Sequence, residues 1–306
     1  MKRIFSRLIK RDQKKEPDRA ALLAARLENP YRPVFGSERS FEELVRAKSE
    51  RSDFSMGNKY TAMAFSPTGS TAHIAQAILQ GMGGETFCDV TVSGDPLRFA
   101  PGQLVVFAVP VFGGRVPVPA LERVKQLHGN GANAAAVVVY GNRAYEDAML
   151  ELAAALSRAG FIVNGGAAFV ARHSVTPAIA SGRPNRDDLE KARDFGAALR
   201  EKMEAGKTRP VQLPGNIPYR IFNGMPFKPM VSGSCQQCGV CAENCPTGAI
   251  SKDNPFQTDP NKCITCMRCV ALCPHQARSL SPEAQDAMAA KLARVCIRPG
   301  KVETYL

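Results

Sequence analysis

The chain has 306 residues, of which 44% are apolar and 22% charged, with ten cysteines and no tryptophan. This apolar fraction supports a packed core and excludes global disorder, and the length accommodates two domains more readily than one. No apolar run approaches the roughly 20 residues that a membrane-spanning helix requires. The N-terminal residues do not have the pattern of a signal peptide, so we expect a cytoplasmic protein.

The formal net charge is +12, and part of the excess lies in the first 15 residues. No recognition helix, zinc finger or mixture of basic and aromatic residues accompanies it, so we expect no nucleic-acid partner. A basic stretch of this kind is more typical of a solvated tail. Because apolar residues fall near one helical face, peripheral membrane contact through residues 1–15 stays open as a weaker alternative.

Residues 1–55 form an expected N-terminal extension, with one helix at Asp18–Leu27 and a capping box that begins at Ser40. Strands then alternate with helices through residues 56–206. We expect strands at Tyr60–Phe65, Phe87–Val92, Leu104–Val109, Ala134–Tyr140 and Phe161–Val170, and helices at Thr71–Gln80, Pro119–Leu127, Tyr145–Ala159 and Asp187–Ala205. This alternation predicts an α/β domain with a doubly wound parallel sheet.

Residues 207–234 are rich in proline and read as a partly stiffened linker. Residues 281–306 form a C-terminal helix and tail, because Ser281 and Pro282 are a typical helix start. Met288, Leu292 and Val295 give that helix one apolar face.

Eight of the ten cysteines form two runs with identical spacing. Each run reads C-x2-C-x2-C-x3-C-P, and the eight are Cys235, Cys238, Cys241, Cys245, Cys263, Cys266, Cys269 and Cys273. In proteins with two [4Fe–4S] clusters, the fourth cysteine of each such run ligates the other cluster. We therefore expect one cluster on Cys235, Cys238, Cys241 and Cys273, and a second on Cys263, Cys266, Cys269 and Cys245.

Structural zinc and disulfides are the alternatives for these cysteines. Zinc ribbons use two separated ligand pairs and not a third cysteine with a trailing proline, so the doubled spacing favours iron–sulfur clusters. Residues 235–280 are then a small α+β ferredoxin-type domain. Cys88 and Cys296 lie outside the runs and are expected to be small core residues.

The first loop of the α/β region is rich in hydroxyl groups and lies between a strand and a helix. It supplies the candidate anion-binding residues Ser66, Thr68, Gly69, Ser70 and Thr71. Because the loop lacks lysine and a G-x-G-x-x-G pattern, it favours a small phosphate over a nucleoside triphosphate or dinucleotide. An ordinary hydroxyl helix cap is the alternative.

Two more loops follow strands that end at the same sheet edge, where ligands bind in open α/β sheets. They add Pro110, Val111, Phe112, Gly113, Gly114, Tyr140, Gly141, Asn142 and Tyr145, whose glycines and aromatic rings suit a flat ring.

From about Tyr60 to Ala205 the chain resembles flavodoxin, because Ser66–Thr71 matches the T/S-x-T-G-x-T phosphate loop. Together with the doubled cysteine runs, the whole resembles the flavodoxin–ferredoxin fusion family. The resemblance implies a flavodoxin-like domain that binds FMN beside two [4Fe–4S] clusters, and an electron-transfer function. The net charge of +12 suits acidic protein redox partners. Arg115 and Arg143 near the ring would make the flavin less reducing than in flavodoxin; arginines that point into solvent or onto an acidic partner are the alternative. An FMN-dependent reductase fed by its own clusters, and a redox-sensing or interaction protein with an empty flavodoxin-like domain, remain alternatives.

Overall fold

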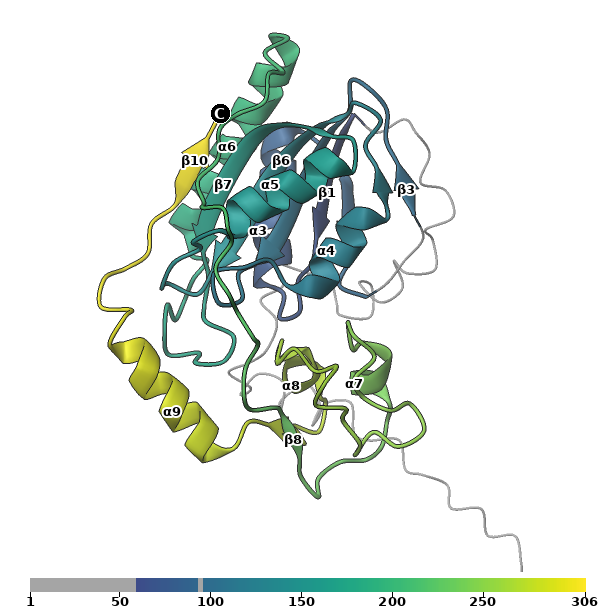
Figure 1. Ribbon diagram of the computed structural model, residues 1–306, viewed down its shortest axis with the longest axis vertical. Coiled ribbons are helices and arrows are strands. Elements are labelled where there is room, and N and C mark those ends of the chain that lie inside the picture. The colour runs from purple at the N-terminus through teal and green to yellow at the C-terminus, as the bar shows by residue number, and fades with distance from the viewer. Residues whose placement is uncertain (1–58, 93–95) are drawn as a thin grey trace, which may run out of the picture.

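The computed structural model describes residues 59–92 and 96–306, which build a central six-stranded sheet in the order β10-β7-β6-β4-β1-β2 (Figure 1). The parallel strands are β1 (Tyr60–Ala64), β2 (Thr86–Asp89), β4 (Leu104–Pro110), β6 (Asn133–Tyr140) and β7 (Ile162–Val170). The short strand β10 (Glu303–Tyr305) pairs antiparallel with β7. The elements expected in residues 1–55 lie outside the described residues.

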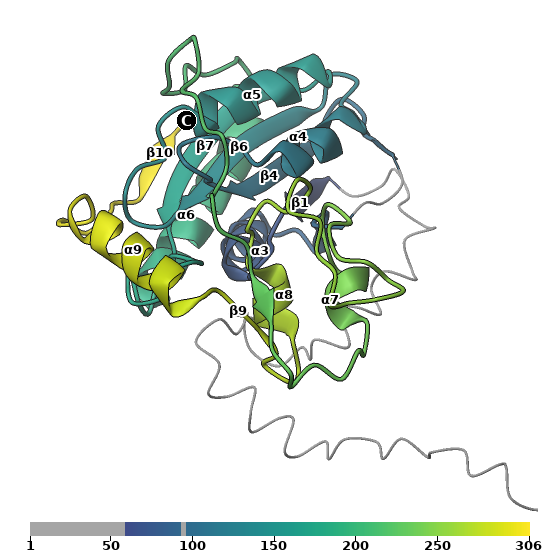
Figure 2. The same ribbon diagram turned by 60° about the horizontal axis from the view of Figure 1, so that its bottom comes forward.

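Helices cover both faces of this sheet. Helices α3 (Ser70–Met82) and α6 (Arg186–Glu204) share one apolar core with the sheet, and α4 (Val118–Lys125) and α5 (Ala148–Arg158) share the other (Figures 1 and 2). Strand β6 is buried along its whole length, because apolar side chains meet a helix layer on each side. The predicted doubly wound α/β domain is confirmed, and its strands and helices end within three residues of the predicted positions.

The order of the parallel strands, β2-β1-β4-β6-β7, is the flavodoxin-like order 2-1-3-4-5. The chain reverses direction across the sheet between β1 and β4, so the loops after these strands border a natural ligand crevice. The predicted hydroxyl-rich loop is the loop after β1.

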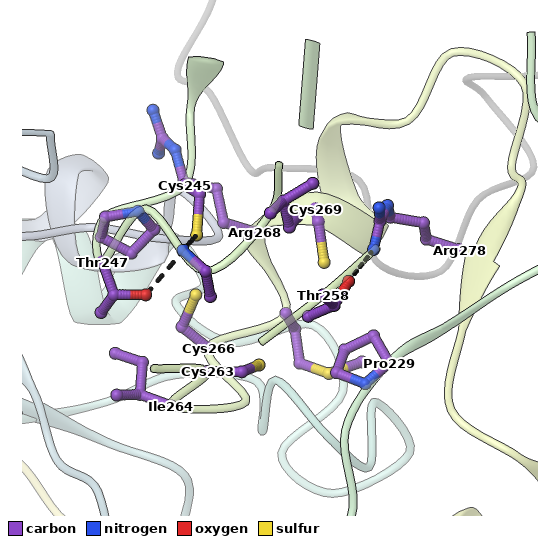
Figure 3. A pocket seen from close by; sticks show the side chains of 14 residues that line it. Pro229, Cys245, Thr247, Thr258, Cys263, Ile264, Cys266, Arg268, Cys269 and Arg278 are labelled. Atoms are coloured by element: carbon purple, nitrogen blue, oxygen red, sulfur yellow. Dashed lines mark hydrogen bonds between the residues drawn. The ribbon is translucent and has the colours of Figure 1, made fainter. Parts of the chain in front are cut away.

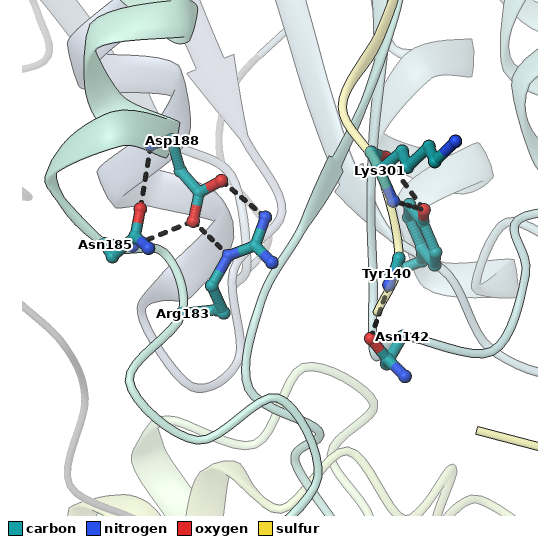
Figure 4. Close-up of polar contacts among 7 residues, drawn as sticks. Tyr140, Asn142, Arg183, Asn185, Asp188 and Lys301 are labelled. Carbon is teal, nitrogen blue, oxygen red and sulfur yellow. Dashed lines mark hydrogen bonds and ion pairs between the residues drawn. The ribbon is translucent and has the colours of Figure 1, made fainter. Parts of the chain in front are cut away.

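The start of α6 illustrates how local sequence sets a boundary. The Asp188 amide donates to Asn185 Oδ1 at 3.0 Å, and the Asn185 amide donates to Asp188 Oδ2 at 2.9 Å (Figure 4). Arg183 pairs with the same carboxylate. This capping box fixes the end of the loop that follows β7.

The cysteine-rich segment lies at the carboxyl edge of the sheet and contains only short elements (Figures 1 and 2). They are α7 (Val240–Glu243), α8 (Arg268–Leu272) and the antiparallel pair β8 (Met230–Val231) and β9 (Arg278–Ser279). A second small pair, β3 (Leu97–Arg98) and β5 (Leu127–His128), runs parallel beside the main sheet.

The C-terminal helix α9 (Pro282–Ala293) begins as predicted, because Ser281 Oγ accepts a hydrogen bond from the Ala284 amide at 3.2 Å. Met288 and Leu292 are buried, but Val295 is 53% exposed. The expected apolar face was therefore wrong at Val295, which lies beyond the end of the helix. No helix among the described residues is both long and apolar enough to cross a bilayer.

The expected linker is held on the surface of the α/β domain. The buried Asp147 carboxylate accepts hydrogen bonds from the Asn216 amide at 2.9 Å and the Arg220 amide at 2.7 Å. Arg115 Nη1 also donates to the Arg220 carbonyl at 2.7 Å, and its guanidinium lies 5.1 Å from the centre of the Tyr219 ring. These contacts fix the path that leads to the cysteine-rich segment.

Candidate cofactor sites

The loop after β1, residues 66–71, is shaped by its own hydroxyl groups; we call it the phosphate loop. Ser66 Oγ accepts from the Ala72 amide at 2.9 Å, and the Ser66 amide donates to Thr91 Oγ1 at 2.7 Å. Gly69 has φ of 93° and stands at the N-cap of α3, a position without a capping side chain. A left-handed φ favours glycine, and the N-terminus of a thirteen-residue helix presents amide donors and positive potential.

Three predicted loops meet at one cavity, the phosphate-loop cavity, and two further segments join them. The lining residues are Pro67, Thr68, Ser70 and Thr71 after β1; Pro110, Val111 and Phe112 after β4; Val139, Tyr140 and Gly141 at the end of β6; Ala171, Arg172, His173 and Ser174 after β7; and Cys266 of the cysteine-rich segment. Eight of these belong to the predicted set: Thr68, Ser70, Thr71, Pro110, Val111, Phe112, Tyr140 and Gly141. The lining therefore combines hydroxyl groups with apolar and aromatic side chains.

Of the other predicted contacts, Ser66 and Gly69 shape the phosphate loop without lining the cavity. Gly113 and Gly114 make a tight turn, in which Phe112 and Arg115 exchange backbone hydrogen bonds of 2.9 and 3.1 Å. Both glycines have positive φ, 59° and 85°, as a type I′ turn requires. A Cβ on Gly113 would lie 2.2 Å from the Phe222 ring, so this turn packs against the linker instead of the cavity.

Asn142 and Tyr145 face the C-terminal segment. Asn142 Oδ1 accepts from the Gly300 amide at 2.7 Å, and the Tyr145 hydroxyl donates to Glu303 Oε2 at 2.6 Å. Tyr140 lines the cavity but also holds this segment, because its hydroxyl donates to the Lys301 carbonyl at 2.8 Å and accepts from the Lys301 amide at 3.0 Å (Figure 4).

Arg115 and Arg143 do not line the cavity. Arg115 makes a two-pronged contact with Glu151, at 2.9 and 2.6 Å, and Arg143 makes one with Glu146, at 2.7 and 2.9 Å. Glu151 and Glu146 hold both guanidinium groups outside the cavity, so neither arginine contacts a group bound there, and the less reducing flavin stays a prediction.

His173 and Arg172 are cavity residues that the sequence analysis missed. His173 Nδ1 accepts hydrogen bonds from the amides of Val175 and Thr176 at 3.2 and 3.1 Å. Burial, and secondarily the charge of Arg143, lowers the pKa of His173 to about 4. The imidazole is therefore neutral at pH 7 and carries its proton on Nε2. Their position shortly after the fifth predicted strand, at the same sheet edge as the other loops, could have identified His173 and Arg172 from the sequence.

The second predicted cysteine set lines a single cavity, which we call the cluster cavity. Cys245, Cys263, Cys266 and Cys269 surround it, together with Arg268, Arg278 and apolar residues (Figure 3). Among the described residues, no three Cys, His, Asp or Glu side chains converge on a point that one metal ion would occupy. Four thiols around one cavity suit a cubane, which takes four cysteine thiolates.

Two members of the first predicted set lie near Cys241. Besides burial, the neighbouring thiols of Cys273 and Cys238 contribute to raising the pKa of Cys241, so three of the four expected ligands are close together. The fourth cysteines of the two runs have equivalent hydrogen bonds from the amide four residues later. Cys245 Sγ accepts from the Ala249 amide at 3.3 Å, and Cys273 Sγ accepts from the Ala277 amide at 3.2 Å.

Burial raises the pKa of the Cys266 thiol to about 12 and also raises that of Cys269. Metal ligation requires thiolates, and a bound metal itself deprotonates the thiols that ligate it. Cys266 lines both the cluster cavity and the phosphate-loop cavity, and thus separates the two sites.

The cysteine-rich segment also has clear relatives. A family model described as a 4Fe–4S dicluster domain matches residues 234–277. The ferredoxin-like protein in the nif region of Rhizobium leguminosarum bv. trifolii is 42% identical over 57 residues, which cover 16% of this chain and 88% of that protein. Through this segment the chain belongs to the 4Fe–4S dicluster family, and its cofactors include two [4Fe–4S] clusters.

Other similarities are more partial. The thiosulfate reductase electron transfer subunit PhsB of Salmonella typhi is 38% identical over 77 residues, which cover 24% of this chain and 40% of that protein. The chain therefore spans less than half of that relative. A solved flavodoxin from the domain Archaea is 16% identical, with a TM-score of 0.36 over 47% of this chain and 98% of its own.

Proposed function

We propose that the protein is an electron carrier that relays electrons between FMN, two [4Fe–4S] clusters and an external redox protein. One observation carries the proposal: the phosphate-loop cavity and the cluster cavity share the wall formed by Cys266. Two redox groups on either side of one ligand side chain are suited to direct exchange. This arrangement corresponds to the flavodoxin–ferredoxin fusion suggested by the sequence.

The phosphate-loop cavity fits FMN by the chemistry of its lining. Thr68, Ser70 and Thr71 offer hydroxyl donors beside the α3 N-terminus, which suits a small dianionic phosphate. Phe112 and Tyr140 provide flat apolar walls for a ring. FMN, when bound, exchanges electrons singly or in pairs and would connect a two-electron partner to the one-electron clusters.

The ligand sets assign an order to the relay. Cys263, Cys266, Cys269 and Cys245 would hold the cluster beside the FMN site, and Cys235, Cys238, Cys241 and Cys273 would hold the outer cluster. Cys238 is exposed, so the outer set offers an approach for a protein partner. The net charge of +12 favours an acidic partner, and eight reduced cysteines suit the cytoplasm.

A matched pair of variants tests the FMN site. Thr68→Asp places a carboxylate on the phosphate loop, whereas Thr68→Asn has nearly the same shape without charge. We expect Thr68→Asp to weaken FMN binding by at least tenfold, about 1.4 kcal/mol, through repulsion of the phosphate. FMN titration of flavin-depleted, anaerobically prepared protein measures this effect, and iron analysis should show no loss.

The wild-type protein should carry about eight irons and about one FMN per chain. Equal FMN affinity in the two variants would place the phosphate elsewhere. Full iron without FMN would favour the redox-sensing or interaction protein. Steady turnover of a small organic acceptor would favour the FMN-dependent reductase.

A further inference from the structure

Two arginines are buried against the cluster cavity, although burial of a cation is unfavourable without a negative partner. Arg268 and Arg278 are only 8% and 3% exposed, and both line the cavity (Figure 3). Their Nε atoms have no hydrogen-bond partner among the described residues. Buried donors are normally paired, so the structure offers two N–H groups and two positive charges to a group within this cavity.

Arg278 lies between the two ligand sets. Its guanidinium donates to Thr258 Oγ1 at 3.2 Å and to the Pro255 carbonyl, which fixes its position. Cys241 of the outer set packs with Cys245 and Cys269 of the inner set in one small buried cluster. The charge of Arg278 acts to lower the pKa of both the Cys241 and the Cys269 thiol. No ion pair of Arg278 with a carboxylate occurs within the described part of the chain.

Arg268 extends from the inner set to the phosphate loop. Its Nη1 donates to the carbonyls of Ser66 and Pro67 at 3.2 and 3.4 Å. Its nearest carboxylate contact is long, with 3.8 Å between Nη2 and Asp89 Oδ2. Arg268 therefore brings a buried positive charge next to Cys266 and Cys269, with Asp89 as a carboxylate partner at long ion-pair distance.

The chemistry of the bound group explains this arrangement. A cubane ligated by four thiolates carries net negative charge, and reduction adds one electron without making or breaking a bond. A buried cation favours the more negative state, and an N–H donor to sulfur acts in the same direction. Because low-dielectric surroundings screen poorly, the effect persists at high salt.

We propose that Arg268 and Arg278 tune the clusters: Arg278 raises the reduction potential of both, and Arg268 raises only that of the inner cluster. The inner cluster then has the higher potential, and electrons that enter at the outer cluster pass toward the flavin side. This inference rests on the ligand assignment of the proposed function, but it does not require FMN to be bound.

Potentiometric titration of the anaerobically purified full chain, followed by electron paramagnetic resonance, tests the proposal. Arg278→Gln should lower both midpoint potentials, and Arg268→Gln should lower one and leave the other in place. Lys252→Gln is the matched control, because it removes the same charge from an exposed position of the same segment. The shifts should persist when the salt concentration is raised, and iron and sulfide content should stay at the wild-type level.

Fully loaded Gln variants with the midpoint potentials of Lys252→Gln would overturn the tuning role. If the Gln variants lose iron, Arg268→Lys and Arg278→Lys retain the charge and should load with smaller shifts in the same pattern. Lys variants that load but shift the cluster not assigned to that arginine, or that also lose iron, would likewise overturn it. Wild-type protein with full iron but no FMN would contradict the relay alone, so the two failures are distinguishable.

Discussion

At the residue scale, His173 shows how a cavity side chain makes stability depend on pH. Its Nδ1 accepts two backbone amides, so protonation at this nitrogen would remove both bonds. The pKa of His173 is about 4 in the fold, because burial disfavours the imidazolium. An unfolded histidine has a pKa near 6.5, so between these values the unfolded chain binds the proton more readily.

Stability therefore decreases as the pH falls from about 6.5 toward 4, and we expect a loss of about 1 kcal/mol by about pH 5.5. His173→Asn keeps an acceptor oxygen near the Nδ1 position but does not titrate in this range. Anaerobic guanidinium unfolding at about pH 6.5 and about pH 5.5 measures the free energy of unfolding at each pH. The variant should lose about 1 kcal/mol less than the wild type between these two pH values. An identical pH dependence in wild type and variant would contradict the assignment.

At the scale of elements, the C-terminal segment is an accessory strand that side chains of the β6 loop hold in place. Asn142 has φ of 71°, accepts from the Gly300 amide, and donates through Nδ2 to the Arg298 carbonyl at 3.0 Å. Asn142→Gly preserves the left-handed backbone and removes both bonds. We expect β10 to open about fivefold more often, for a cost of about 1 kcal/mol.

Hydrogen exchange of a peptide that covers Glu303–Tyr305 measures this opening. Asn142→Asp is the control, since it keeps the acceptor for Gly300 and should give a smaller increase. Unchanged exchange in Asn142→Gly would show that the β7–β10 pairing alone holds the strand.

The parallel strands and large helices were predictable because each carries its own periodicity, such as the unbroken apolar run of β6. Strand β10 was not, because three residues with the sequence Glu-Thr-Tyr carry no pattern and become a strand only beside β7. Partners distant in the sequence also explain why Asn142 and Tyr145 face the C-terminal segment instead of the predicted flavin site. Their loop follows the predicted strand, but partners more than 150 positions away occupy it.

The dicluster segment was predictable from the cysteine spacing, because one short loop must supply several ligands to one cubane. The assignment of four particular cysteines to each cluster stays a prediction. The roles of Arg268 and Arg278 were not predictable, since an arginine beside a cysteine run is usually solvated. Only tertiary packing, which leaves these side chains 8% and 3% exposed, distinguishes them from surface cations.

At the scale of the whole molecule, the cluster region and the α/β domain form a shared core. Val175, in the loop after β7, packs in one buried apolar cluster with Met267 of the cysteine-rich segment and Met288 of α9. Arg123 of α4 adds a polar contact by donating to the Pro246 carbonyl at 3.1 Å. Order in the cysteine loops is thereby coupled to order around the phosphate loop.

Removal of iron should consequently loosen the α/β domain at a defined place. Without a cluster the four thiols of the inner set have no common ligand, and Arg268 has no negative partner inside the cavity, so its contacts with the Ser66 and Pro67 carbonyls should weaken. We expect hydrogen exchange to rise several-fold in peptides that cover residues 65–69 and 174–179. Apparent FMN affinity should fall in parallel, because the phosphate loop must then be ordered on binding.

A peptide from the middle of α6, around Phe195, serves as the internal control, because it packs on the far layer against α3. A rise confined to residues 235–280 would mean that the cluster region unfolds independently of the domain on which it sits. A rise that includes α6 would mean global destabilisation. The coupling is supported only if exchange increases at the phosphate loop and the β7 loop while α6 stays unchanged. That result would mean that the bound clusters help to keep the phosphate loop ordered for FMN binding.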